Sequence, residues 1–159
     1  MSLVITWSNY MQGRDTAYVR DFTLEIGRNA RRTIEVVNAV LEAMAADGVD
    51  LAGVHVASGW RPPAVNAETQ NHAEHSKHLT AEACDLGDLP DRRLCRWALA
   101  NPQKLWDSGV RAIERPQWTP SWLHVQTVAP PSGHFLFVPS SAAPKVAALP
   151  GELEMPRLA

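Results

Sequence analysis

In the stretch Leu123-His124-Val125-Gln126-Thr127, apolar and polar residues alternate. Successive side chains of a β-strand point to opposite faces of the sheet, so the apolar residues share one face while His124 and Gln126 share the other. The same alternation recurs in Ala83-Cys84-Asp85-Leu86, where Asp85 opposes its apolar neighbours. We therefore expect two strands that pack one face on a core and present His124 and Asp85 on the opposite face.

A long amphipathic helix precedes these strands. Thr23 can cap a helix that runs to about Asp47-Gly48, and Glu25 in its first turn favours the helix dipole. Apolar residues recur every three or four positions and mark one buried face: Ile26, Ala30, Ile34, Val37, Leu41 and Met44. This face offers a surface on which a small sheet can pack.

Shorter elements complete one small domain. Further strands are expected at about 53–57, 110–113 and 135–138, between Gly and Pro turn signals. Asp88 is expected to cap a helix that has Pro90 near its first turn and that Asn101-Pro102 ends. The polar segment 61–80 has little periodicity and is expected to be mainly loop.

The pattern as a whole predicts an α+β fold in a single small domain. A short antiparallel sheet packs on the long N-terminal helix, and the domain covers residues 1–139. The Ala/Pro-rich segment 140–159 is expected to be a loosely attached tail.

Composition limits the classes of function. The chain has 159 residues, of which 45% are hydrophobic, so it can bury a core as one domain. A net charge of −2 supplies no field that would gather nucleic acid or an anionic membrane. No apolar stretch reaches the roughly 18–20 residues that span a bilayer. We therefore expect no nucleic-acid partner and no membrane insertion.

The N-terminus and the cysteines predict where the chain is made. The first residues lack the basic region and apolar run of a secretory signal, so we expect a protein made in the cytoplasm without a signal peptide. Cys84 and Cys95 have neither a metal-binding nor a disulfide-framework spacing and are expected to be reduced packing residues.

The polar residues of the two strands form a candidate metal site with an upstream histidine. His78, Asp85 and His124 offer two imidazoles and one carboxylate, and three protein ligands leave the fourth position of a zinc ion open for water. Such a site generates a hydroxide nucleophile near neutral pH. Taken singly, Asp85 could cap a turn and His124 could be a hydrogen-bonded core residue. His72, His75 and His78 are an alternative cluster if they share one helix face.

The wider pattern resembles a known family. Ser-x-His-x-x-x-x-Ala-x-Asp at 76–85 is followed by Trp-x-His-Val at 122–125, and the upstream segment Ser58-Gly59-Trp60-Arg61-Pro62-Pro63 looks like a Ser-Gly-aromatic-Arg motif. In order and spacing these motifs, within residues 54–138, resemble the M15 zinc peptidases, the group of D-Ala-D-Ala carboxypeptidases and phage endolysins. Arg14-Asp15 and the stretch from 114 to 124 look like a phage-associated branch of that family.

The resemblance implies a hedgehog/D-Ala-D-Ala-peptidase-like fold and one zinc ion per chain, held by His78, Asp85 and His124. It implies hydrolysis of a peptide bond in the stem peptides of bacterial peptidoglycan, by carboxypeptidase or endopeptidase action. A phage or prophage protein of this kind acts on the cell wall after holin-dependent release or virion delivery. The alternative is a non-catalytic zinc-containing binding module, or a virion structural component of the same fold.

The general base departs from the family pattern. Many relatives carry an acid three residues before the last zinc histidine, or a histidine two before, and this chain has neither. Glu114 is therefore the candidate base, although it could instead pair with Arg111 or Arg115 at the surface. Glu82 and Glu74 are weaker candidates.

The resemblance also implies which residues bind substrate. Arg61 is implied to hold a substrate carboxylate or to stabilise the developing oxyanion, which suits its planar guanidinium. Ser76, Trp122 and Gln126 are the other candidate substrate-binding residues. The family often has glycine where this chain has Ala81, a change that a negative φ would allow.

Overall fold

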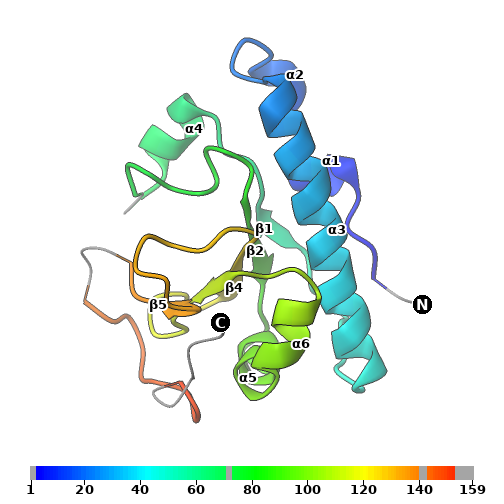
Figure 1. Cartoon of the computed structure of the whole chain (residues 1–159), viewed down its shortest axis with the longest axis vertical. Helices are drawn as coiled ribbons and strands as arrows, with labels where there is room; N and C mark the ends of the chain where they lie inside the picture. The colour runs from blue at the N-terminus through cyan, green and yellow to red at the C-terminus, as the bar shows by residue number, and fades with distance from the viewer. Residues whose placement is uncertain (1–2, 71–72, 140–142, 153–159) are drawn as a thin grey trace.

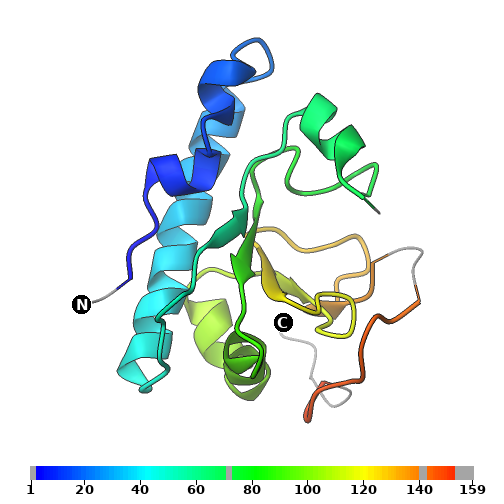
Figure 2. The ribbon, with the colours of Figure 1, turned by 180° about the vertical axis from the view of Figure 1, so that it is seen from behind.

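The computed structural model describes residues 3–70, 73–139 and 143–152. Its helices are α1 (Trp7–Met11), α2 (Arg14–Ala17), α3 (Leu24–Ala46), α4 (Pro63–Glu68), α5 (Arg93–Ala100) and α6 (Pro102–Asp107). Its strands are β1 (Val56–Ser58), β2 (Ala83–Gly87), β4 (Trp122–Gln126), β3 (Ala112–Glu114) and β5 (Leu136–Phe137), in this order across one sheet. α3 runs along one side of the sheet, so the predicted α+β architecture is confirmed (Figure 1; Figure 2).

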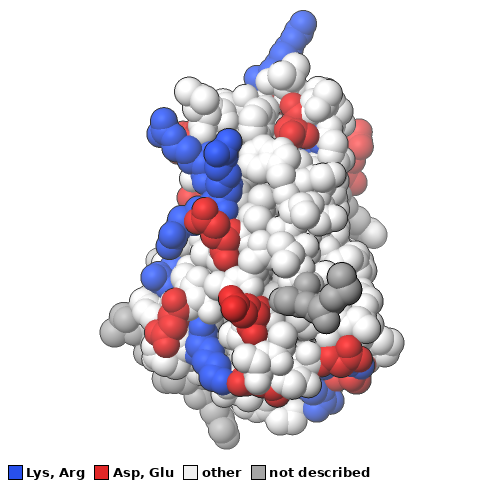
Figure 3. Space-filling model, turned by 90° about the vertical axis from the view of Figure 1, so that its right-hand side faces the viewer, with Lys and Arg blue, Asp and Glu red and all other residues white. Residues whose placement is uncertain are grey.

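The longest element is the predicted amphipathic helix. α3 begins after Thr23, whose hydroxyl accepts a hydrogen bond from the Ile26 amide at 3.2 Å. Its buried residues are Ala30, Thr33, Val36, Val37, Val40, Leu41 and Met44. Ile26 and Ile34 lie at the edge of this face and are only partly buried. The side of the molecule over α3 carries interspersed positive and negative side chains beside a broad uncharged area (Figure 3).

The alternation in the two central strands sorts their side chains as predicted. Cys84 and Leu86 of β2 are fully buried in the core, as is Leu123 of β4. β2 and β4 pair antiparallel with Asp85 opposite His124, and residues directly opposite one another share a face. Both polar side chains therefore lie on the face opposite the core.

The sheet departs from the expected all-antiparallel arrangement at its edge. β3 pairs antiparallel with β4 but parallel with β5. The chain reverses after β3 and again after β4, so β5 runs in the direction of β3. β2 already occupies the other edge of β4, and β5 therefore adds beside β3. The remaining strands are antiparallel, with bounds shifted from the predicted ranges by a few residues.

Two helical features differ from the expectations. The segment predicted to be mainly loop contains α4, which begins with Pro63 at its first position, where a missing amide hydrogen costs nothing. α5 begins at Arg93, later than a cap at Asp88 would suggest. The Asp88 carboxylate nevertheless accepts hydrogen bonds from the Leu94 and Cys95 amides at 3.0 and 3.1 Å, so it does cap this helix. α6 follows directly at Pro102.

Both cysteines are free and buried, as predicted. Burial raises the pKa of the Cys84 thiol and raises that of Cys95 to about 12, so both stay protonated at neutral pH. None of the helices in the described part of the chain combines the length and apolar character that crossing a bilayer requires.

Ala81 adopts a backbone conformation that usually favours glycine. Its φ is +58°, in the left-handed region, so the negative φ that would make alanine equivalent to glycine here is not present. A residue with a Cβ pays about 1–2 kcal/mol for this conformation, which explains why glycine suits the position. Two hydrogen bonds to the Ala81 carbonyl hold it, from the Tyr10 hydroxyl at 3.0 Å and from the Thr33 hydroxyl at 2.7 Å. Helices α1 and α3 thus fix the turn that leads into β2.

Gly59 is required by close packing at the end of β1. A Cβ at this position would overlap the Tyr10 carbonyl oxygen. The backbone of α1 can therefore approach the chain here only because residue 59 has no side chain. This contact gives a physical reason for the glycine in the Ser58-Gly59 motif.

The Gly59→Ala substitution should lower the free energy of unfolding by at least about 2 kcal/mol, because the overlap is with backbone and cannot relax by a side-chain rotation. Gly27→Ala is the matched control. A Cβ at Gly27 meets only the tip of the Phe22 ring at 3.3 Å, and alanine favours the helix by up to about 1 kcal/mol. Urea unfolding curves measure both; equal stability of the two variants would contradict the packing argument.

Candidate metal centre

One row of side chains crosses the whole sheet. Ser58 lies opposite Asp85, and Asp85 lies opposite His124. The β3–β4 register, continued by one residue, sets Glu114 opposite His124. Phe137 pairs with Glu114 in the parallel register, and its ring makes an edge contact with His124 at 5.9 Å between centroids. These five side chains share the face opposite the core.

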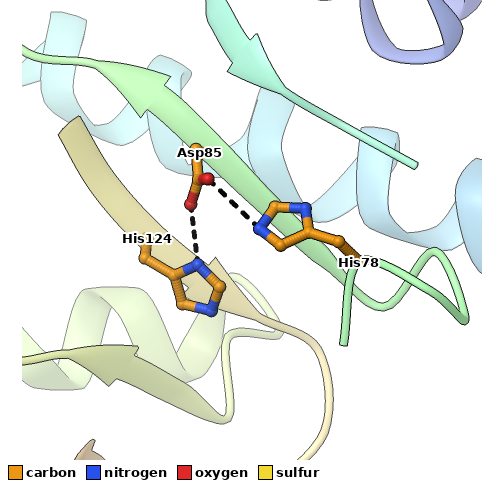
Figure 4. Close-up of side chains that lie close together, drawn as sticks. All are labelled: His78, Asp85 and His124. Atoms are coloured by element: carbon orange, nitrogen blue, oxygen red, sulfur yellow. Dashed lines mark hydrogen bonds and ion pairs between the residues drawn. The ribbon is translucent and has the colours of Figure 1, made fainter. Parts of the chain in front are cut away.

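Asp85 joins two histidines at the centre of this row. Its Oδ1 lies 2.7 Å from His124 Nδ1, and its Oδ2 lies 3.2 Å from His78 Nε2 (Figure 4). His78 comes from the turn before β2, whereas the other two residues come from neighbouring strands. One potential ligand atom from each residue lies within 4.8 Å of the others. The three residues predicted from the sequence therefore do form one buried cluster.

The second ring nitrogen of His78 fixes its tautomer. Nδ1 lies 2.7 Å from the Gly59 carbonyl oxygen, which can only accept, so Nδ1 carries the hydrogen. Nε2 then presents a lone pair, yet it is buried and has no hydrogen-bond donor among the described residues. Burial lowers the pKa of His78, which keeps the ring neutral. An available lone pair in a buried position is what a metal ligand requires.

His124 is held on both sides. Its Nε2 lies 3.1 Å from Gln126 Oε1, and the Gln126 amide nitrogen donates to the Val128 carbonyl at 3.3 Å, which orients the carboxamide. Although burial alone would lower it, the Asp85 carboxylate raises the pKa of His124 to about 9. The two histidines in turn keep the pKa of Asp85 well below its usual range, against the effect of its burial. The centre therefore carries one exchangeable proton, on His124.

The spacing of the three residues fits a metal ion. With bonds of about 2.0–2.1 Å, neighbouring ligand atoms of a tetrahedral ion lie roughly 3.3 Å apart. The separations of the Asp85 oxygens from His78 Nε2 and His124 Nδ1, 3.2 and 2.7 Å, are close to this value, and all three ligand atoms lie within 4.8 Å of one another. The nitrogen of each histidine that faces away from Asp85 already bonds an oxygen, as in most metal-bound histidines. The cluster could thus hold a metal ion.

The cluster lies in a cavity of about 860 Å³. Every other residue predicted for the site lines the same cavity: Arg61, Ser76, Glu114, Trp122 and Gln126. The segment 61–78 and the strands β1, β2, β3 and β4 thus contribute side chains to one site. No short stretch of the chain contains all of them.

Arg61 and Ser76 are coupled to each other and to His78. The Arg61 amide donates to the His78 carbonyl at 3.0 Å, and its guanidinium donates to Ser76 Oγ at 2.8 Å. Ser76 Oγ also accepts a hydrogen bond from the His78 amide at 3.3 Å. Arg61 Nε is buried without a hydrogen-bond acceptor in the described part of the chain. The guanidinium is therefore held in place with donor capacity to spare.

Glu114 lies in the cavity, and no ion pair joins it to Arg111 or Arg115 among the described residues. Arg111 instead donates to the Trp106 and Val110 carbonyls. Burial raises the pKa of Glu114, and Asp85 raises it further, while His124 acts in the opposite direction. Glu114 is thus a carboxylate that can hold a proton more readily than an exposed one.

The other candidate acids and histidines lie elsewhere. Glu82 pairs with Lys77 at 3.6 Å and is not part of the cavity wall, and Glu74 is exposed. His75 lies in a turn at the cavity wall and is exposed, whereas His72 lies outside the described residues. The alternative histidine cluster therefore lies partly outside the described residues.

Arg14, Phe137 and Lys145 are among the residues of the cavity wall that were not predicted from the sequence. Phe137 could have been found from the alternation of β5. Lys145 belongs to the predicted tail, of which 140–142 and 153–159 lie outside the described residues. Its amide donates to the Gln117 carbonyl at 2.8 Å, and its ammonium group lies 5.4 Å from the Trp122 ring centroid. No sequence signal connects such a residue to the site.

Comparison with known proteins supplies no relative. No protein-family model, no curated protein and no solved structure matches this chain. The interpretation of the site therefore depends on its own geometry and chemistry.

The protein should bind about one divalent metal ion per chain, and His124→Ala should reduce the affinity by at least about 100-fold, because losing a ligand costs more than losing a residue that only orients one. Gln126→Ala, which removes the partner of His124 Nε2, should cost about 10–100-fold. His55→Ala, which changes an exposed histidine outside the cavity, is the control. Metal analysis and calorimetric titration measure these effects; undiminished binding by His124→Ala would place the ion elsewhere.

Metal affinity should rise about tenfold per pH unit between pH 6 and 8, because each bound ion displaces the proton of His124. The sign follows from the pKa of about 9: below it the ring is protonated, so affinity falls as the pH falls. Calorimetry in two buffers of different ionisation enthalpy should show about one proton released per ion at pH 7. A pH-independent affinity would show that His124 is neutral without metal.

Proposed function

We propose that this protein is a zinc-dependent metallopeptidase that hydrolyses a peptide bond in the stem peptides of bacterial peptidoglycan. The main support is the buried His78–Asp85–His124 centre at the wall of a cavity that also contains a carboxylate and a guanidinium. Two imidazoles and one carboxylate are a ligand set of catalytic zinc sites. The resemblance of the motifs to M15 peptidases supports the substrate class and a hedgehog/D-Ala-D-Ala-peptidase-like fold.

A zinc ion in this centre would supply Lewis acidity that activates water and polarises a carbonyl oxygen. Glu114 then acts as general base: it takes the proton of the attacking water and returns it to the leaving amine. Its place beside His124 in the row of side chains supports this role. Its raised pKa also supports it, because a base that must later act as an acid works best near the operating pH.

Arg61 stabilises the negative charge that develops on the substrate carbonyl, or holds a substrate carboxylate. Its guanidinium is positioned by Ser76 before substrate enters, so little reorganisation accompanies the reaction. The unsatisfied Nε provides a further donor for an oxygen of the substrate. Ser76 and Trp122 are proposed to contact the peptide directly. Gln126 orients His124 and borders the same space.

We further propose that the protein is phage or prophage associated and acts on the cell wall after holin-dependent release or virion delivery. The support is the resemblance of its motifs to the phage-associated branch of the M15 peptidases. A second candidate, a non-catalytic zinc-containing binding module or virion component, is favoured by one observation: this chain lacks the acid or histidine that many M15 peptidases carry just before their last zinc histidine.

Digestion of purified peptidoglycan with the zinc-loaded protein separates the two candidates. A peptidase releases new amine termini and shortened or separated stem peptides, which mass spectrometry identifies. The chelator-treated protein and the His124→Ala variant are the controls and should release none. Sedimentation of the protein with peptidoglycan, without any released peptide, would favour the binding module.

The Glu114→Gln substitution should lower kcat by about 10²–10⁴-fold, because it keeps the size of the side chain and removes its basicity. Zinc content and thermal stability should hardly change. Glu82→Gln is the matched control, since that carboxylate lies outside the cavity wall and should leave kcat within about twofold of the parent. Full activity of Glu114→Gln would remove this residue from the mechanism and leave the base unassigned.

A further inference from the structure

A second arginine lies in the cavity beside Arg61. Arg14 is the first residue of α2 and lines the cavity together with Ala57 and Ser58 of the β1 side. α2 and α4 lie at the same end of the molecule (Figure 1; Figure 2). The Arg14 guanidinium donates to the Trp60 carbonyl at 2.7 Å, immediately before Arg61 in the chain.

That hydrogen bond uses one terminal nitrogen of Arg14 and leaves the other donors of the guanidinium available. The group is tied to the backbone that also carries the metal centre, because the Gly59 carbonyl accepts from His78 and the Arg61 amide donates to the His78 carbonyl. Arg14 is thus held at a defined distance from the metal centre.

Neither arginine has an anionic partner in the described part of the chain. The ion pairs there involve other basic residues, among them Lys77 with Glu82. Asp15, the carboxylate next to Arg14 in the chain, instead accepts a hydrogen bond from the Trp7 indole. Asp85 is committed to the two histidines.

Two guanidinium groups in one cavity repel each other, and both are partly removed from water. Burial lowers the pKa of both side chains. At Arg61 the carboxylates of Asp85 and Glu114 act in the opposite direction, while the charge of Arg14 lowers the pKa further. Such an arrangement costs free energy unless an anion enters, and arginine side chains bind carboxylates through paired hydrogen bonds. The unpaired charge therefore predicts the chemistry of the ligand.

We propose that Arg14 is a specificity-determining residue that, together with Arg61, binds a carboxylate of the peptide substrate on the β1 side of the metal centre. This inference deepens the proposed function and rests on it for the class of substrate. The carboxylate can be the C-terminus of the peptide or an acidic side chain within it. In either case a peptide that lacks it leaves two half-buried cations without a carboxylate partner and binds poorly.

The test uses the full-length zinc-loaded protein and three synthetic stem peptides. One carries a free C-terminal carboxylate and a glutamate, the second has an amidated C-terminus, and the third has glutamine in place of the glutamate. Calorimetric Kd values and kcat/KM values are measured for each. The parent protein should bind one of the two amidated peptides at least about tenfold more weakly than the acidic peptide, and the identity of that peptide reveals which carboxylate is bound.

Arg14→Gln should remove most of the preference for the acidic peptide. It should leave Kd and kcat/KM for the disfavoured amidated peptide within about threefold of the parent values. Arg14→Lys keeps the charge and a donor for the Trp60 carbonyl, and should retain part of the preference. Arg20→Gln removes the same charge from an exposed arginine outside the cavity. It should change neither the preference for the acidic peptide nor the Kd and kcat/KM values. Metal content and melting temperature verify that the variants remain folded.

The outcomes separate this inference from the proposed function. Acid-selective binding that Arg14→Gln abolishes, without cleavage of any peptide, would sustain the inference and reject the peptidase. Cleavage with the same selectivity in the parent and in Arg14→Gln would reject the inference and sustain the peptidase. Failure of the parent to bind any of the three peptides, or equal weakening of all three by Arg14→Gln, also overturns the inference.

Discussion

The carboxylate of Asp85 lies between two buried histidines, and these contacts connect β2 with β4 and with the turn before β2. A buried charge is stable only when hydrogen-bonded partners or a metal surround it. Here the protonated ring of His124 on the adjacent strand is the hydrogen-bonded partner, and His78 from the turn before β2 places its Nε2 beside the other carboxylate oxygen. The pairing of β2 with β4, and the path of the chain from His78 to Asp85, must therefore be correct together.

The contacts around this centre connect it to the helical layer. The Ala81 carbonyl binds the hydroxyl groups of Tyr10 and Thr33, and Gly59 packs against the backbone of α1. Gly59 also accepts the hydrogen bond that sets the tautomer of His78. A change in the helices is thereby transmitted to His78 through a short series of contacts, so the core and the site form one packing unit.

The charged side chains of the cavity lower the stability of the fold and suit a site that binds a ligand. Glu114 is half-buried with a raised pKa, and Arg14 and Arg61 form no ion pair within the described structure. Groups of this kind destabilise a folded chain and are characteristic of sites that bind or transform a ligand. The hydrogen bonds of Arg14 to Trp60 and of Arg61 to Ser76 hold these charges in place.

The sequence by itself determined the long helix, the alternation of β2 and β4, and the three residues of the candidate metal centre, because periodicity and ligand chemistry are local properties. Only the tertiary structure decided that β5 lies parallel to β3, that Ala81 has a positive φ, and that Glu114 lies opposite His124. Those features depend on which edges and contacts remain available once the other elements have packed. The same holds for Arg14, which reaches the cavity because α2 folds back toward Trp60, a contact between residues far apart in the chain.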